Sequence, residues 1–210
     1  MKEELVVSSH AINESNFHIQ LTPAYRRDIF RNKMVQELTL AYLPPNCVLL
    51  SFDEKGKTAI KIYGGQKYVF KGYYHIPYGQ KVKGICDLFM ARNLHTGKRH
   101  YTFYDWKNSF IVTEFLEKLL EFYPDADVYI IWDGWSAHRS EHTKMFLDLH
   151  PRIKILPLPT RASWLNPVER DFGSIQRFLL NNSDFQSVME LMKASEVFIE
   201  KELSSNGTCT

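Results

Sequence analysis

The sequence predicts an α/β domain built on a mixed β-sheet with helices on both of its faces. Short apolar runs, rich in branched and aromatic residues, recur along the chain and are typical of strands. Segments with apolar residues at helical spacing alternate with these runs, but only in the second half of the chain. Three strands in succession, followed by strands that alternate with helices, imply a sheet with both antiparallel and parallel pairs.

The first half of the chain supplies one helix and three strands. Residues 22–43 are expected to form a helix and its exit, which ends at Pro44-Pro45. The run "CVLLSFDEKG" predicts a strand from Cys47 to Phe52 that is closed by a charged turn. The stretch "ICDLFMARNLHTGKRHYTFYDW" predicts two antiparallel strands joined around His95-Thr96-Gly97.

The second half predicts the alternating part of the sheet. Apolar residues at helical spacing predict a helix over 109–122, which stops before Pro124. "DVYIIWDG" is expected to be a strand buried on both faces, and a helix from about Ser140 to Leu149 and the strand "RIKILPL" follow it. The last main helix is expected to begin at Asn166, with a weaker one near 188–201. This order is compatible with a ribonuclease H-like fold, although pattern alone also admits other α/β arrangements.

The length of 210 residues suits one domain with extensions. We expect an N-terminal helical extension or linker over 1–45, the α/β domain over 46–182, and a C-terminal helix and tail over 183–210. No apolar run approaches the roughly 20 residues of a membrane span, and the start resembles no signal peptide, so we expect a cytoplasmic protein with no membrane partner. The three cysteines form no CxxC pair, which argues against a zinc knuckle or a disulfide framework.

Charge is distributed unevenly along the chain. Residues 53–107 carry 11 Lys and Arg against 4 Asp and Glu, with aromatic residues interleaved, whereas residues 108–150 carry 3 against 8. A basic and aromatic segment suits a polyanion such as DNA, and a solvated lysine-rich hairpin face is the equally compatible alternative. The candidate contacts to the DNA backbone in this segment are Lys55, Lys57, Lys61 and Lys67.

Three acidic residues stand where elements begin or end. Asp53 follows the strand "VLLSF", Asp133 follows "VYIIW", and Glu169 lies in the first turn of the last main helix. Functional side chains gather where the strands of an α/β sheet end, and three carboxylates suit two Mg²⁺ ions, which prefer oxygen ligands. Each acid also has a structural alternative: Asp53 as a turn former, Asp133 in an Asp-Gly hairpin turn, and Glu169 as half of a capping box with Asn166.

Three blocks of the sequence resemble the signature blocks of DDE transposases in the mariner-like branch of bacterial and archaeal insertion sequences. The blocks are "FDEKGKTAIKIYGG", "IIWDGWSAHRS" and "LPTRASWLNPVERDFGSIQR", in the same order and at similar separations. The resemblance runs from about residue 43 to residue 180 and implies a ribonuclease H-like fold. It also implies that Asp53, Asp133 and Glu169 form the metal-binding triad, with two ions of Mg²⁺ or Mn²⁺.

The resemblance extends to residues around the triad. His138 falls where the family often has a histidine five residues after the second aspartate, and it either positions a ligand or a phosphate or is simply a packed histidine. Asn166 is expected to cap the helix that presents Glu169. Arg161 is a candidate phosphate contact, and Trp164 either stacks on a base or packs in the core.

The resemblance implies a transposase catalytic domain that cleaves phosphodiesters at insertion-sequence ends and transfers the freed strand to target DNA. DNA is then the partner, with self-association on DNA and a location at the nucleoid. The family commonly has asparagine after the second aspartate, where this chain has Gly134, and it normally carries N-terminal helix-turn-helix domains, here expected to be absent or separately encoded. Two alternatives stay open: a catalytically silent DNA-binding remnant, and a ribonuclease H-like nuclease without strand transfer.

Overall fold

The computed structural model of the chain describes residues 44, 46–64, 75–158 and 163–203. The helix predicted over residues 22–43 lies outside this part. No helix within the described ranges is long and apolar enough to cross a membrane. Cys47 and Cys86 are free thiols.

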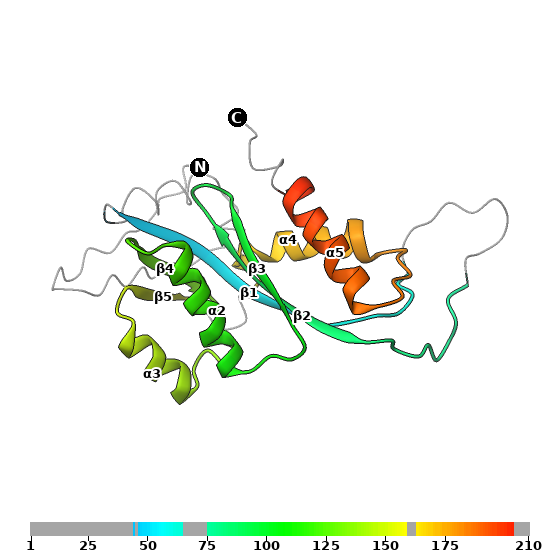
Figure 1. Cartoon of the computed structure of the whole chain (residues 1–210), viewed down its shortest axis with the longest axis horizontal. Helices are drawn as coiled ribbons and strands as arrows, with labels where there is room; N and C mark the ends of the chain where they lie inside the picture. Colours follow the sequence, from blue (N-terminus) through cyan, green and yellow to red (C-terminus); the bar gives the residue numbers. More distant parts are fainter. Residues whose placement is uncertain (1–43, 45, 65–74, 159–162, 204–210) are drawn as a thin grey trace, which may run out of the picture.

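The described residues form a five-stranded mixed sheet in the order β3-β2-β1-β4-β5 (Figure 1). The strands are β1 (Cys47–Ala59), β2 (Ile85–Asn93), β3 (Arg99–Tyr104), β4 (Asp127–Trp132) and β5 (Ile153–Pro157). The first three pair antiparallel, whereas β4 pairs parallel with both β1 and β5. The predicted mixed sheet is therefore confirmed, with β1 at its centre.

Strand β1 is longer than the sequence indicates. It continues past Phe52 to Ala59, and Asp53 and Glu54 lie within it, opposite Met90 and Phe89 of β2. The charged turn predicted after Phe52 is wrong, because β2 supplies hydrogen-bonding partners for the backbone of these charged residues. The strand becomes irregular only between Lys55 and Thr58.

The helices confirm the predicted alternation. They are α2 (Ser109–Phe122), α3 (Glu141–Leu149), η2 (Ser163–Leu165), α4 (Glu169–Ser174), η3 (Ile175–Leu180), α5 (Val188–Phe198) and η4 (Ile199–Leu203). Helix α2 begins as predicted because the Asn108 side chain accepts a hydrogen bond from the Ile111 N–H, and α3 begins with the same arrangement between Ser140 and Thr143. Helix α4 begins at Glu169, three residues later than predicted.

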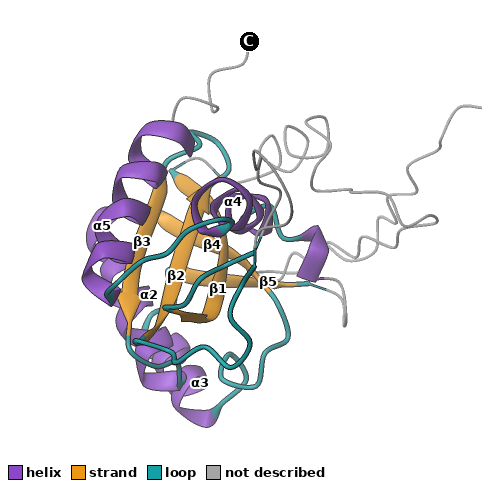
Figure 2. Ribbon diagram, turned by 90° about the vertical axis from the view of Figure 1, so that its right-hand side faces the viewer, coloured by secondary structure: helices purple, strands orange, loops and turns teal. Residues whose placement is uncertain are grey.

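The helices cover both faces of the sheet, and β1 divides its side chains between them (Figures 1 and 2). On one face, Leu50 and Phe52 pack in a core with α2 and α3. On the other face, Met90 and neighbouring side chains of the sheet pack with α4, η3 and α5. Because side chains alternate along a strand, Ser51 and Asp53 of β1 lie on the face of α4, whereas Glu54 lies on the face of α2 and α3.

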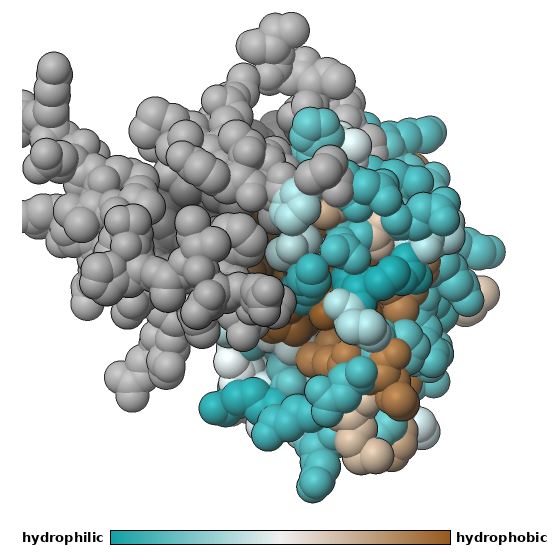
Figure 3. Space-filling view, turned by 90° about the vertical axis from the view of Figure 1, so that its left-hand side faces the viewer, coloured by the Kyte–Doolittle hydropathy of each residue, from teal (hydrophilic) through white to brown (hydrophobic). Residues whose placement is uncertain are grey.

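The end of the molecule at which β1 begins carries a patch of apolar side chains among hydrophilic ones (Figure 3). Exposed apolar residues in the described part of the chain include Phe122 of α2 and Leu149 of α3. The surface is therefore not uniformly hydrophilic, although charged residues make up 24% of the chain.

Candidate functional site

Asp53 is a buried carboxylate on the central strand. Its side chain lies on the face covered by α4, and only 6% of the residue is exposed. One carboxylate oxygen, Oδ1, accepts a hydrogen bond from the Glu54 N–H at 2.8 Å. Burial raises the pKa of Asp53 to about 8, and the negative charges of Glu54, Glu169 and Asp133 act in the same direction. Burial and the neighbouring carboxylates therefore both disfavour the ionised form of Asp53.

Asp133 lies at the end of β4, the parallel neighbour of β1. The register pairs Ser51 with Ile131, so two residues further along the strands Asp133 lies level with Asp53. Its Oδ1 accepts a hydrogen bond from the Trp135 N–H at 3.0 Å, and its side chain is 29% exposed. The hairpin alternative for Asp133 is wrong, because β4 is followed by α3 and by the parallel strand β5.

Glu169 is the first residue of α4 and is half-buried. The predicted cap by Asn166 is wrong: the N-cap position is Val168, and no side chain of the helix start caps it. The Val168 N–H instead donates to the Ser51 hydroxyl of β1 at 2.9 Å. The Asn166 N–H donates to the Ser163 carbonyl at 2.7 Å, so it is not available to Glu169 for a capping box.

The side chain of Asn166 contacts β1 instead of capping α4. It is 1% exposed, and its Nδ2 donates to the Phe52 carbonyl at 2.7 Å and lies 3.4 Å from Oδ2 of Asp53. Its Oδ1 accepts from the Ser51 hydroxyl. Asn166 and Ser51 therefore fasten the segment that leads into α4 directly to β1, beside Asp53.

His138 contacts Asp133 and Glu54, which lie 79 residues apart in the chain. Its Nε2 is 2.8 Å from Glu54 Oε1, and its Nδ1 is 3.1 Å from the Asp133 carbonyl and 3.3 Å from Asp133 Oδ1. Burial lowers the pKa of His138, but the hydrogen bonds to Asp133 and Glu54 outweigh burial and raise it to about 9. The same contact with His138 is the main cause that lowers the pKa of Asp133.

The donor set fits a divalent cation. Carboxylate oxygens are the ligands that Mg²⁺ prefers, and a bound cation would favour the ionised form of Asp53, which burial and the neighbouring carboxylates disfavour. Within the described ranges, no three His, Cys, Asp or Glu side chains are already grouped closely enough to hold one ion. The structure thus brings the three predicted acids to one region of the sheet, where their charges act on one another, rather than to ion-binding distance.

The predicted DNA contacts are only partly within the described residues. Lys57 and Lys61 are exposed, whereas Lys55 is half-buried and its Nζ donates to Gln176 at 3.2 Å. Burial lowers the pKa of Lys55, and the charge of Glu169 raises it. Lys67, Arg161 and the side chain of Trp164 lie outside the part of the chain that the structure describes.

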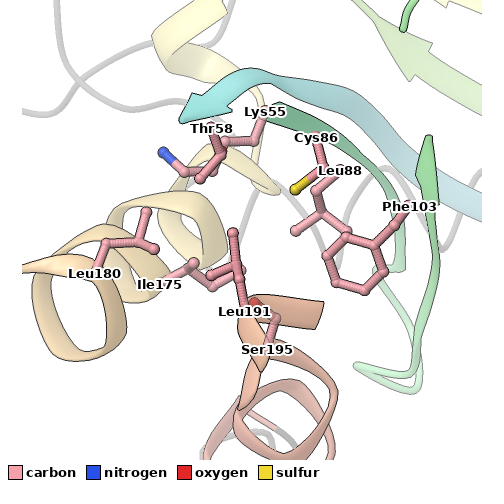
Figure 4. Close-up of a pocket in the computed structure, with 9 residues that line it drawn as sticks. All are labelled: Lys55, Thr58, Cys86, Leu88, Phe103, Ile175, Leu180, Leu191 and Ser195. Carbon is pink, nitrogen blue, oxygen red and sulfur yellow. The ribbon is translucent and has the colours of Figure 1, made fainter. Parts of the chain in front are cut away.

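A small pocket lies beside Lys55, between β1, β2, β3 and the helices η3 and α5 (Figure 4). Aliphatic and aromatic side chains line most of it, including Leu88, Phe103 and Leu191. These residues belong to or pack against the apolar core on this face. The pocket is therefore part of the packing of the helices on the sheet and carries no carboxylate.

Sequence reasoning missed several residues of the site. Lys107 lies with its Nζ 4.4 Å from the centre of the Trp135 ring, and its charge lowers the pKa of Asp133. Asp171, two residues after Glu169, forms a bidentate ion pair with Arg99 of β3. Lys107 and Arg99 both lie in the basic segment 53–107, but no local sequence pattern distinguishes either of them from its other basic residues.

Comparison with known proteins matches the chain to one family of nucleases. The sequence model of the family described as "DDE superfamily endonuclease" matches residues 48–192. The "Insertion element IS630 uncharacterized 39 kDa protein" of Shigella sonnei is 27% identical over 115 residues, which cover 53% of this chain and 34% of that protein. The chain thus spans about a third of the length of this curated relative.

Solved structures of the Mos1 transposase share the fold. The paired-end complex with the left transposon end matches with a TM-score of 0.60 and 16% identity, over 99% of this chain and 63% of that one. The catalytic domain of the Mos1 mariner transposase matches with a TM-score of 0.57 and 13% identity, over 89% of each chain. Paired-end complexes described as "with Mn" and "with Mg" match with TM-scores of 0.60 and 0.57. The ribonuclease H-like fold expected from the sequence is confirmed.

Proposed function

The chain belongs to the DDE superfamily endonuclease family, and on this premise we propose that it is the catalytic domain of an insertion-sequence transposase. It cleaves phosphodiester bonds at the ends of the element and joins the freed 3′-hydroxyl to target DNA. The observation that carries the proposal is the buried carboxylate of Asp53, on which the charges of Asp133 and Glu169 act from the next strand and from α4. Residues 46–182 are the catalytic unit in this proposal.

In this proposal Asp53, Asp133 and Glu169 hold two ions of Mg²⁺ or Mn²⁺. The ions supply activation of the attacking water or hydroxyl and stabilisation of the leaving oxygen. Asp53 and Asp133 are fixed by adjacent parallel strands, and Glu169 is fixed by the anchoring of α4 to β1 through Ser51 and Asn166. The three ligands thus stand on rigid backbone, as a metal site requires.

Basic residues on the same part of the chain bind the DNA backbone. Lys57 and Lys61 are exposed, and Lys107 lies beside Asp133. Contacts of lysine to phosphate position the DNA without reading its sequence, and they weaken as salt rises. We propose that recognition of the element ends needs a further part, encoded with or separately from this chain, and that the protein self-associates on DNA at the nucleoid.

Nicking of supercoiled plasmid by the purified chain in Mg²⁺ or Mn²⁺ tests the proposal. We expect nicking by the wild type and its loss in Asp53→Asn, Asp133→Asn and Glu169→Gln, with circular dichroism unchanged. Asp127→Asn and Glu114→Gln are the matched controls, because each removes an exposed carboxylate that pairs with a lysine away from the triad. Equal nicking by the wild type and the three triad variants would refute the assignment.

Joining of an oligonucleotide with a free 3′-hydroxyl to a target plasmid separates a transposase from a nuclease. We expect joined product that requires the same three carboxylates. Nicking without joining would identify a ribonuclease H-like nuclease. DNA binding with neither reaction would identify a silent remnant, the outcome that the departure at Gly134 favours.

A further inference from the structure

Glu54 is a buried carboxylate that the proposed mechanism does not use. It follows Asp53 directly but lies on the opposite face of β1, and its side chain is 2% exposed. Burying a carboxylate is unfavourable unless a partner compensates it. The partner is His138, whose Nε2 lies 2.8 Å from Glu54 Oε1. Because burial of the Glu54 carboxylate costs free energy, and because Glu54 is adjacent to the proposed metal ligand Asp53, we asked what Glu54 does in the site.

The ring of His138 is held in one orientation. Its side chain is fully buried, and the ring stacks in parallel on Trp132 with the centroids 4.3 Å apart, while Trp135 contacts it edge-on. Both ring nitrogens face oxygen atoms: Nε2 faces Glu54, and Nδ1 faces the carbonyl and Oδ1 of Asp133. Since carboxylate and carbonyl oxygens only accept hydrogen bonds, each nitrogen donates one.

The two carboxylate oxygens of Asp133 differ in their contacts with the protein. Oδ1 accepts from the Trp135 N–H at 3.0 Å and lies 3.3 Å from His138 Nδ1. Within the described part of the chain, Oδ2 takes part in no hydrogen bond. The carboxylate is therefore oriented with one oxygen held by the protein and the other available to an ion.

We propose that Glu54 is a positioning residue for the metal site: it fixes the ring of His138, which in turn fixes the carboxylate of Asp133. This inference rests on the proposed function, because it assumes that Asp133 is a metal ligand. Partners that orient a ligand in this way commonly change metal affinity by about 10–100-fold when they are removed. Glu54 thus acts on the ion from the far face of the sheet, without contact to it.

The main rival explanation is that Glu54 only adds negative charge near the site. The two explanations differ in the sign expected for His138→Gln. If charge alone matters, removal of the positively charged ring strengthens Mn²⁺ binding. If orientation matters, Glu54→Gln and His138→Gln each weaken it, and the double variant is no weaker than the single ones, because both act on one contact chain.

Titration of the full chain with Mn²⁺, followed by the electron paramagnetic resonance signal of the free ion, decides between them. We expect at least tenfold weaker binding in Glu54→Gln and His138→Gln, with no further loss in the double variant. His100→Gln is the matched control, since His100 is also a buried histidine with a side-chain partner, in this case the Tyr123 hydroxyl directly after α2. We expect this variant to bind Mn²⁺ as the wild type does.

Glu54→Asp gives a second test in case Glu54→Gln does not fold. It keeps the charge but shortens the reach to His138, so it weakens Mn²⁺ binding only if orientation matters. Wild-type affinity for Mn²⁺ in Glu54→Gln or Glu54→Asp, or tighter binding in His138→Gln, would overturn this inference but leave the proposed function standing. Mn²⁺ binding that is unaffected by Asp53→Asn, Asp133→Asn and Glu169→Gln would overturn the metal site of the proposed function, and the inference with it.

Discussion

Removal of one partner from the buried ion pair between Asp171 of α4 and Arg99 of β3 is expected to destabilise the fold strongly. Arg99 Nε lies 2.9 Å from Asp171 Oδ2, and Nη2 lies 3.0 Å from Oδ1, a bidentate geometry. Both side chains are 4% exposed, and Arg92 approaches the same carboxylate at 3.4 Å. Asp171→Asn would remove the buried negative charge that Arg99 binds through two hydrogen bonds. We therefore expect the free energy of unfolding to fall by about 3–5 kcal/mol.

Urea unfolding, followed by circular dichroism, measures this loss. The double-mutant cycle with Arg99→Gln should give a coupling free energy of about 2 kcal/mol or more, because the two side chains share two hydrogen bonds. Glu114→Gln is the control: it breaks the exposed pair with Lys118, and its effect should stay below about 1 kcal/mol. If Asp171→Asn lowers the free energy of unfolding by less than about 1 kcal/mol, with an unchanged denaturant slope, the ion pair does not anchor α4 to the sheet.

Three further predictions concern the site and the sheet. Gly134→Asn should change the free energy of unfolding by less than about 0.5 kcal/mol, since an added Cβ meets no atom within 4 Å, and a gain in nicking would show that the missing amide matters. Asp53→Asn should raise the melting temperature of the metal-free protein at pH 7, because folding raises the pKa of the Asp53 carboxyl to about 8 and this costs stability at any pH above its ordinary value, and Mg²⁺ should then no longer stabilise the protein; a lower melting temperature would contradict this. His100 has a pKa lowered by burial to about 4, so its neutral form stabilises the fold above pH 6.5, and up to about 3 kcal/mol is lost as the pH falls from 6.5 to 4. His100→Gln should lose less stability than the wild type over this range in urea melts.

The sequence predicted the bounds of an element correctly where nearby residues set those bounds. Helix α2 has the predicted bounds because Asn108 caps its start and Pro124 prevents its continuation. The turn between β2 and β3 falls at Gly97, which adopts a positive φ of 74°. The end of β1 was misplaced because charged residues suggest a turn, whereas pairing with β2 keeps them in the strand.

The sequence predicted those features of the candidate site that depend on a single element, but not the contacts between elements that are distant in the chain. Asp133 directly follows the end of β4, as predicted, whereas Asp53 lies within β1. The placement of Glu54 on the face opposite to Asp53 follows from alternation along β1. The partner of Glu54 lies 84 positions away, and no periodicity reports such a contact. Asn166 matched the local pattern of a cap, but in the fold its side chain binds Ser51 and Asp53.

Four consecutive residues of β1 connect the three carboxylates. Ser51 and Asp53 lie on the face of α4, where Asn166 links them to the segment that carries Glu169. Phe52 and Glu54 lie on the other face, where the ring of His138 packs against Phe52 and links Glu54 to Asp133. A shift of the pairing register by one residue would exchange the two faces and break both links at once. The register of the central strand therefore fixes the relative positions of the candidate metal ligands, and β1 is the element in which fold and function depend most on each other.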